Sequence, residues 1–227
     1  MDMILFVALV LVIYGILWGA AHCGREAMFG ALGVMCTISF LFAAKIVNVA
    51  GYPLVPSAPI LAFIFYSGSI LQEFYSVQDA RKVLWINLGS MLCFAGLGLL
   101  VRYMPLFIAD DALGQSYDTL LDFYPQALGA ALAAFSTSYG LNMLLNGVLH
   151  RAFGTKFFPL RSFTTVALSN LWDITAFIAL AYPWTESSLK MIVMTWLMRL
   201  GCIILGVPVI WLIKRDYTKR QPHVTTL

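Results

Sequence analysis

Four charged side chains lie inside or at the end of apolar stretches of the sequence, where an ionised group is energetically costly. They are Lys45, Glu73, Asp173 and Arg199. A charge inside a bilayer costs several kcal/mol, so such residues pair with one another, reach the interface or serve a function. Lys45 lies within a turn of the outer end of its segment, where its ammonium can reach the interface. Glu73 lies late in its own segment, toward the cytoplasmic side.

Asp173 and Arg199 are placed for an ion pair near mid-membrane. A short connection around residues 183–189 joins the segments that carry them, so the two helices are antiparallel. Each residue lies about nine or ten positions from that connection, which at about 1.5 Å per residue puts both about 14 Å from the outer face. Two interpretations stay open: a fixed pair that only joins two helices, or a pair that opens or shares its charges with a solute.

Polar residues repeat at helical spacing in three of the apolar segments. Side chains three and four positions apart share one face of a helix. One such stripe is typical of helix–helix contacts, but three stripes with carboxylate, amide and aromatic groups predict a polar cavity within a bundle. The stripes are Tyr66, Ser69 and Glu73; Tyr139, Asn142 and Asn146; and Ser162, Thr165, Ser169 and Asp173, with Asn170 at the border of the last.

The elements that carry these residues are transmembrane helices. Of 227 residues, 61% are hydrophobic and 11% are charged, whereas a soluble domain carries about 25% charged residues. A helix needs about 20 residues to cross the hydrocarbon core. The sequence therefore predicts an all-α, polytopic membrane protein forming one bundle over residues 1–227. Its seven expected spans are Met3–Ala21, Ala27–Val47, Pro59–Tyr75, Val83–Val101, Tyr124–Leu149, Ser162–Tyr182 and Met191–Ile213.

Several classes of protein are excluded by what the sequence lacks. The composition excludes a nucleic-acid binder and a secreted disulfide scaffold, and the four cysteines have no metal-binding spacing. No phosphate-binding loop, nucleophile elbow or paired-histidine zinc motif occurs. We therefore expect no catalytic residue, no cofactor and no metal, and the partners are the lipid bilayer and a small molecule.

The distribution of basic residues predicts the orientation in the membrane. Lysine and arginine gather on cytoplasmic loops. Residues 48–58 carry no charge, and residues 104–123 carry four aspartates and no basic residue. Seven crossings then put the N-terminus outside and the C-terminus, with a tail over 215–227, in the cytoplasm. The basic loop and tail residues are Arg81 and Lys82; His150, Arg151, Lys156 and Arg161; and Lys214, Arg215, Lys219 and Arg220.

Two segments resemble a known family. The stretch IFYSGSILQEFYSVQDARKV, residues 64–83, and the stretch LRSFTTVALSNLWDITAFIALAY, residues 160–182, are similar to the queuosine precursor transporters, also called vitamin uptake transporters. Arg161, Thr165, Asn170 and Asp173 match the order of the family's later signature, and Arg199 falls where the last family helix tends to have a basic residue. The resemblance covers residues 27–214 and implies a six-helix transporter core, with residues 1–26 as an extra helix.

The resemblance implies import of 7-deazaguanine bases, such as preQ0, preQ1 or queuine, across a bacterial inner membrane for salvage in tRNA modification. The chain departs from the family at Ser69, where many members have Asp, and at Asn142 and Asn170, where members have Gln. A carboxylate can accept the two adjacent donors of a guanine-like base, and amides can serve its carbonyl and ring N–H groups. The expected substrate-binding residues are Glu73, Asn142, Asn170, Asp173, Tyr66, Ser69 and Tyr139, and the expected gating or charge-pair residues are Arg199, Arg161 and Lys45.

Other functions stay open at this level. The chain lacks an ATPase motif, so facilitated diffusion, proton coupling through Glu73 or Asp173, and a partner ATPase are alternatives. The last would make the chain the substrate-binding subunit of an ATP-driven vitamin uptake complex. A membrane-embedded enzyme would need a catalytic pair such as Glu73 with Arg81 or Lys82, and we do not favour it. Gly15 and Gly19 have the spacing of a helix-pairing motif, which would allow a homodimer.

Overall fold

The computed structural model describes residues 2–43, 47–49, 52–54, 57–102, 112–155, 157–182 and 184–220. Within these residues it has seven helices and two short strands, β1 (Val47–Val49) and β2 (Tyr52–Leu54), which pair in antiparallel orientation. The predicted all-α fold is confirmed, with this small strand pair added. The helices are α1 (Asp2–Cys23), α2 (Arg25–Ala43), α3 (Ala58–Phe74), α4 (Val77–Arg102), α5 (Ala112–Phe153), α6 (Phe158–Ala181) and α7 (Glu186–Arg220).

Four segments of the described chain are long and apolar enough to cross a membrane. They are Ile4–Cys23, Leu128–Phe153, Phe158–Ala181 and Ser188–Lys219, while α3 is apolar but has only 17 residues. Many large apolar side chains point outward, among them Trp85 at 70% exposed and Leu144 at 69%. Such a surface suits lipid, and the chain is a multi-pass helical membrane protein. The number of seven crossings stays a prediction.

Four helices extend by four or more residues beyond the spans that hydropathy predicts. α6 begins at Phe158, four residues before the expected Ser162, so Arg161 lies in its first turn and not in a loop. α4 begins six residues before the expected Val83, so Arg81 and Lys82 lie in its first turns and not in a loop. α5 begins at Ala112, within the stretch expected to be an outer loop, and α7 continues to Arg220, into the expected tail. Hydropathy marks the part of a helix that lies in lipid, whereas backbone hydrogen bonds continue into charged sequence.

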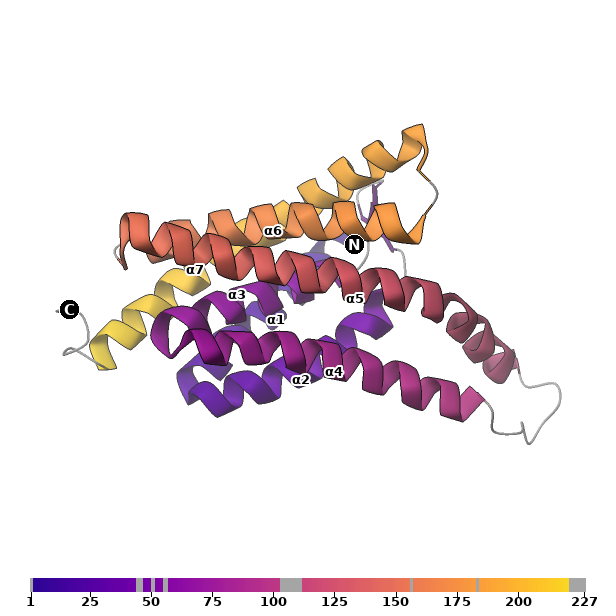
Figure 1. Cartoon of the computed structure of the whole chain (residues 1–227), viewed down its shortest axis with the longest axis horizontal. Coiled ribbons are helices and arrows are strands. Elements are labelled where there is room, and N and C mark those ends of the chain that lie inside the picture. Colours follow the sequence, from indigo (N-terminus) through magenta and orange to yellow (C-terminus); the bar gives the residue numbers. More distant parts are fainter. Residues whose placement is uncertain are drawn as a thin grey trace.

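The helices lie along one another, with the connections gathered at two ends (Figure 1). The α3–α4 turn, the α5–α6 turn and the C-terminal end of α7 lie at one end, and the α6–α7 connection lies at the other. We call the first the basic end, because the basic clusters of the sequence analysis lie there. The structure thus places these basic clusters on one side, as the predicted orientation requires. Lys156 is outside the described residues.

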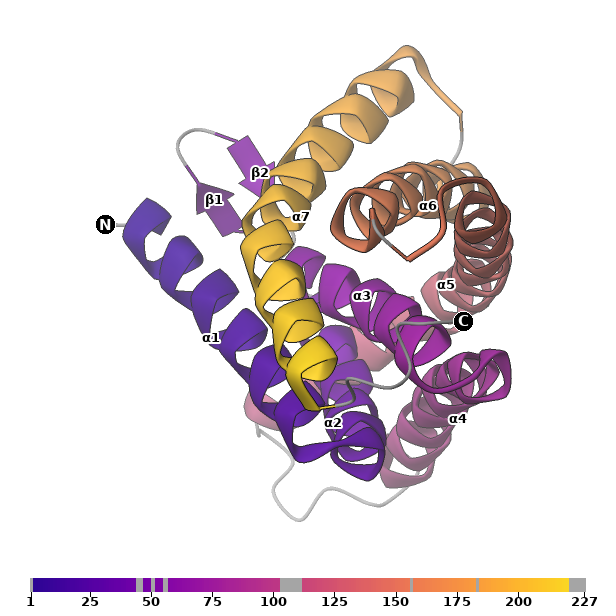
Figure 2. The ribbon, with the colours of Figure 1, turned by 90° about the vertical axis from the view of Figure 1, so that its left-hand side faces the viewer.

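α3 lies at the centre of the bundle, between α1 and α2 on one side and α5 and α6 on the other (Figure 2). It contacts every other helix, and nearly all its side chains from Ala58 to Leu71 are buried. A helix that is apolar around its whole circumference belongs in the core. α3 is therefore the element against which the site helices α5 and α6 are positioned.

α7 is fastened to the bundle by two tyrosines from other helices. The Tyr14 hydroxyl of α1 donates to the carbonyl of Cys202 at 2.7 Å, and the Tyr66 hydroxyl of α3 donates to that of Ile203 at 2.9 Å. A side chain at Gly206 would collide with the Tyr14 ring, with 2.7 Å to its Cε1. α1 is thus packed into the bundle rather than appended to it.

The outer face of α1 carries the two glycines that would allow a homodimer. An added Cβ at Gly15 or Gly19 would meet no atom within 4 Å. The space beside both residues is open, and a dimer contact there stays a prediction.

Candidate functional site

Arg161 is the centre of a polar cluster at the basic end. It lies in the first turn of α6, and its side chain is buried, with 2% exposed. Its guanidinium pairs with the buried carboxylate of Glu73 at the end of α3. It also donates from Nη1 to the carbonyl of Gly154 at 2.7 Å and lies 5.6 Å from the centre of the Phe158 ring. Arg161 therefore joins α3, α5 and α6.

Two residues of α5 complete this cluster. Arg161 Nε donates to Asn146 Oδ1 at 3.0 Å, and Arg161 Nη1 lies 2.9 Å from His150 Nδ1. His150 Nδ1 is also 3.3 Å from the Glu73 carboxylate. Asn146 Nδ2 donates in turn to Gln72 on α3 at 3.4 Å. We call Arg161, Glu73, His150 and Asn146 the Arg161 cluster.

Asp173 and Arg199 form the ion pair between α6 and α7 that the sequence predicts. Arg199 Nη1 donates to Asp173 Oδ2 at 2.6 Å, and both residues are buried. Ser138 of α5 donates to Asp173 Oδ1 at 3.3 Å. Arg199 Nε makes no hydrogen bond to any residue that the structure describes. The Asp173–Arg199 pair is thus less completely satisfied than the Arg161 cluster.

The bonds between α5 and α6 fix the register of these two helices. Ser138 bonds Asp173 at one level, and Asn146 bonds Arg161 at another. The reversed order shows that the helices are antiparallel. Eight residues of α5 separate the two levels, which corresponds to about 12 Å. Asn142, midway between Ser138 and Asn146, therefore lies between these two levels.

Buried polar atoms without partners lie along this interval. Both amide atoms of Asn142, the Ser169 hydroxyl, the Ser162 hydroxyl and Asn170 Oδ1 make no hydrogen bond to the residues described. All four residues are at most 1% exposed. An unsatisfied buried polar group costs about 1–3 kcal/mol, and such groups in native proteins usually meet water or a ligand. We call Asn142, Ser162, Ser169 and Asn170 the polar layer.

A cavity of about 240 Å³ opens beside the Arg161 cluster. Gln72 and Glu73 of α3 and Val77 of α4 form one side of it. Arg161 of α6 and four residues of α5 form the other side, and those of α5 are Asn146, Gly147, His150 and Arg151. This cavity lies at the basic end, next to the level of Asn146.

The remaining predicted residues are placed apart from the polar layer or serve contacts between helices. Tyr66 donates to Ile203, as described, and the Tyr139 hydroxyl donates to the carbonyl of Ala80 at 2.8 Å. The Tyr139 ring packs against Phe135, with centroids 5.5 Å apart. The Ser69 hydroxyl returns to its own helix, at the carbonyl of Phe65. Lys45 lies outside the described residues. A direct contact of these residues with substrate stays a prediction.

Three polar residues of the site were not expected from the sequence. Ser138 bonds Asp173, Gln72 bonds Asn146, and His150 contacts both Glu73 and Arg161. Two of them extend the predicted α5 stripe at a spacing of four, since 138, 142, 146 and 150 share one helix face. That periodicity could have identified Ser138 and His150 from the sequence. It was missed because His150 was expected to lie in a loop and not on the helix.

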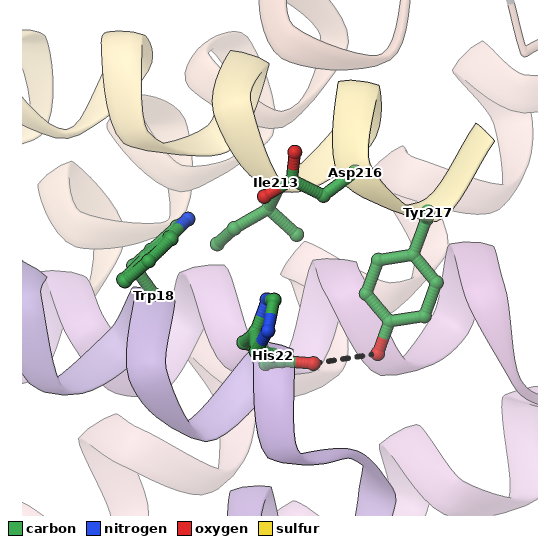
Figure 3. Close-up of a pocket in the computed structure, with 6 residues that line it drawn as sticks. Trp18, His22, Ile213, Asp216 and Tyr217 are labelled. Carbon is green, nitrogen blue, oxygen red and sulfur yellow. Dashed lines mark hydrogen bonds between the residues drawn. The ribbon is translucent and has the colours of Figure 1, made fainter. Parts of the chain in front are cut away.

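A second hollow lies between α1 and α7 and is too small to hold a solute. Trp18, His22, Asp216 and Tyr217 surround it, and Tyr217 donates to the carbonyl of Ala21 at 3.1 Å (Figure 3). Its volume is about 10 Å³, which is room for one water molecule. Among the residues described, no group of three His, Cys, Asp or Glu side chains is arranged to hold a metal ion.

Comparison with known proteins decides the family. The family model described as "Putative vitamin uptake transporter" matches residues 57–213, well over half of the chain. The chain belongs to this vitamin uptake transporter family. A relative from Bacillus subtilis (strain 168), named "Probable queuosine precursor transporter", is 24% identical over 199 residues, which cover 85% of each chain. No solved structure gives a significant match.

Membership in the vitamin uptake transporter family agrees with the resemblance read from the sequence. The family and the relative are named as transporters, and the sequence favours a transporter over an enzyme. The matched range runs from the start of α3 almost to the end of the apolar part of α7, so it includes every residue of the Arg161 cluster, the Asp173–Arg199 pair and the polar layer. The candidate site therefore lies wholly within the matched region.

Proposed function

We propose that this chain imports 7-deazaguanine precursors of queuosine, such as preQ0, preQ1 or queuine, across the bacterial inner membrane. The observation that carries the proposal is the polar layer, which holds buried amide and hydroxyl groups without partners among the residues described. Two of its residues, Ser169 and Asn170, lie about one helical turn from the Asp173 carboxylate on α6. The family and the named relative support a solute of this kind.

The chemistry of the polar layer suits a guanine-like base. Such a base offers two adjacent donors, a ring N–H and an exocyclic amine, which one carboxylate such as that of Asp173 can accept. The free amide groups of Asn142 can serve the ring carbonyl and a ring N–H, and Asn170 Oδ1 can accept another N–H. A ligand bound there would satisfy groups that otherwise lower the stability of the fold. Arg199 positions Asp173 through their ion pair.

The proposed direction of transport follows from the basic end. We place that end in the cytoplasm, with the N-terminus outside, because lysine and arginine gather at it. The polar layer then lies between the mid-membrane Asp173–Arg199 pair and the cytoplasmic Arg161 cluster. A solute released past Arg161 would enter the cytoplasm, where tRNA-modification enzymes would consume it.

The test is uptake of labelled preQ0 and preQ1 by liposomes that contain only the purified chain. We expect saturable uptake, reduced at least tenfold in Asn170→Ala and Asp173→Ala variants. Asn87→Ala is the matched control, since Asn87 is a buried amide on α4 that contacts Met91 and not the site.

The outcomes separate the alternatives. Full uptake by the Asn170→Ala and Asp173→Ala variants would show that the site is elsewhere. Binding of a vitamin or a precursor without uptake would instead favour a substrate-binding subunit that needs a partner ATPase. Uptake that depends on an imposed pH gradient would distinguish proton coupling from facilitated diffusion.

A further inference from the structure

We infer that the cavity at the basic end is a second subsite for the transported solute, a planar bicyclic base, on the cytoplasmic side of the polar layer. The inference rests on the proposed function, and it assigns a role to Gln72, Gly147 and His150, which no sequence pattern placed in substrate binding, and to Asn146 of the predicted α5 stripe. It divides the transport path into two successive positions, one in the polar layer and one in the cavity.

The size of the cavity suits one such base. An apolar cavity of about 150 Å³ holds a benzene molecule, and the cavity here has about 240 Å³. It therefore has room for a second fused ring and a small substituent. It is too small for a nucleotide together with its sugar and phosphate groups.

The lining of the cavity has the groups that bind a base along its edge and its face. Glu73 offers a buried carboxylate, and the amides of Gln72 and Asn146 offer donors and acceptors. Planar bases stack on aromatic rings and on guanidinium groups, and the half-exposed His150 ring and Arg151 supply both. Val77 contributes an apolar wall.

Asn146 connects this cavity to the polar layer. It lies one helical turn after Asn142 on the same face of α5, and its side chain lines the cavity. It is held on one side by Arg161 and on the other by Gln72. A base that leaves Asn142 toward the cytoplasm must pass Asn146, whose long 3.4 Å bond to Gln72 is the weaker of the two. The cavity is thus the next place at which the solute can rest.

The test fills the cavity with a larger side chain, introduced from either of two walls. Gly147→Phe fills it from α5, and Val77→Trp fills it from α4, where the Val77 side chain is 46% exposed and tolerates a larger residue. Gly140→Phe is the control for size on the same helix, since a Cβ there meets no atom within 4 Å.

We expect wild-type protein to bind two equivalents of preQ0 in equilibrium dialysis and both filled variants to bind one. Uptake by liposomes should fall at least tenfold in the filled variants, with Gly140→Phe close to wild type. One equivalent bound by the wild type, or wild-type uptake by the filled variants, would overturn the subsite and leave the proposed function standing. Wild-type protein that neither binds nor transports a deazaguanine would instead overturn the proposed function. If Gly147→Phe does not fold, Val77→Trp alone decides between these outcomes.

Discussion

The ion pairs Glu73–Arg161 and Asp173–Arg199 are both buried, but they differ in how many of their hydrogen-bonding atoms have a partner. Arg161 meets Glu73, Asn146, His150, the Gly154 carbonyl and the Phe158 ring. Arg199 meets Asp173 and keeps an unpartnered Nε among the residues described, while polar atoms without partners lie within two turns on α6. The first pair is part of a closed network, whereas the second borders groups that still need a partner.

This difference separates the Arg161 cluster, whose groups already bind one another beside the cavity, from the polar layer, whose groups have no partner among the residues described. A fully satisfied buried network makes one arrangement rigid, and a partly satisfied one is costly unless something else completes it. The Arg161 cluster ties the end of α3 to the α5–α6 hairpin. The polar layer and Arg199 Nε have buried polar atoms that make no hydrogen bond to the residues described.

Arg161→Ala gives the largest expected loss of stability. It would leave the Glu73 carboxylate buried without its cation and remove the bond to the Gly154 carbonyl, so we expect a loss of about 3–5 kcal/mol. Denaturant unfolding of the detergent-solubilised protein measures it. Arg151→Ala, at the exposed end of α5, is the matched control and should stay within about 0.5 kcal/mol of wild type. A loss below about 1 kcal/mol for Arg161→Ala would contradict its role as the centre of a closed network.

Replacing Asp173 and Arg199 together tests whether their pair serves transport or only packing. A buried pair exchanged for apolar residues is often neutral or stabilising by about 1–4 kcal/mol. We therefore expect the Asp173→Leu, Arg199→Leu double variant to fold at least as stably as wild type and to lose uptake. Either single variant should be less stable than the double variant. Retained uptake in the double variant would favour the fixed pair that the sequence analysis left open.

Two amides of α5, one turn apart, should change the stability of the fold in opposite directions when each is replaced by leucine. Asn142→Leu removes two unpartnered polar atoms, so we expect a gain in stability of about 1–3 kcal/mol together with a loss of preQ0 binding. Asn146→Leu removes bonds to Arg161 and Gln72, so we expect a loss of similar size. Thermal unfolding with and without preQ0 gives both quantities. A destabilised Asn142→Leu variant would show that Asn142 has a structural partner.

A third ion pair, near the surface of the basic end, should have the smallest effect. Asp79 accepts a bond from Lys82 at 2.8 Å and lies 3.6 Å from Arg25, and its backbone N–H donates to the Ser76 hydroxyl at the start of α4. The hydrogen bond from Lys82 is the main cause that lowers the pKa of the Asp79 carboxyl. The Asp79 side chain is 6% exposed, but its partners Arg25 and Lys82 are about half-exposed, so solvent screens these pairs. Pairs open to solvent contribute up to about 1 kcal/mol, so Asp79→Asn should cost no more than that near neutral pH.

The pH dependence of this effect has a definite sign. Because the pKa of Asp79 is lowered in the folded state, its contribution is complete above the ordinary carboxyl pKa. It is lost as the pH falls through the lowered value in the folded protein. The difference in stability between wild type and Asp79→Asn should therefore vanish in acid. A difference that grows as the pH falls would contradict the direction of the shift.

The sequence by itself determined the membrane bundle, the polar faces of its helices and the pairing of Asp173 with Arg199. Apolar length and helical period are properties of a local stretch, and a short connection sets the depth of two residues on adjacent helices. It also showed Asn142 and Asn170 on inward faces. It did not determine where α4, α5 and α7 begin or end, because hydropathy reports the lipid boundary and not the last backbone hydrogen bond.

Only the tertiary structure decided which partner each buried group has. Glu73 and Arg161 are 88 residues apart in the sequence, and they meet because α3 lies at the centre with its end against the α5–α6 turn. The same packing brought His150 into the cluster and left the Asn142 amide without a partner among the residues that the structure describes. These outcomes depend on the rotation and register of several helices at once, and no single helix encodes them.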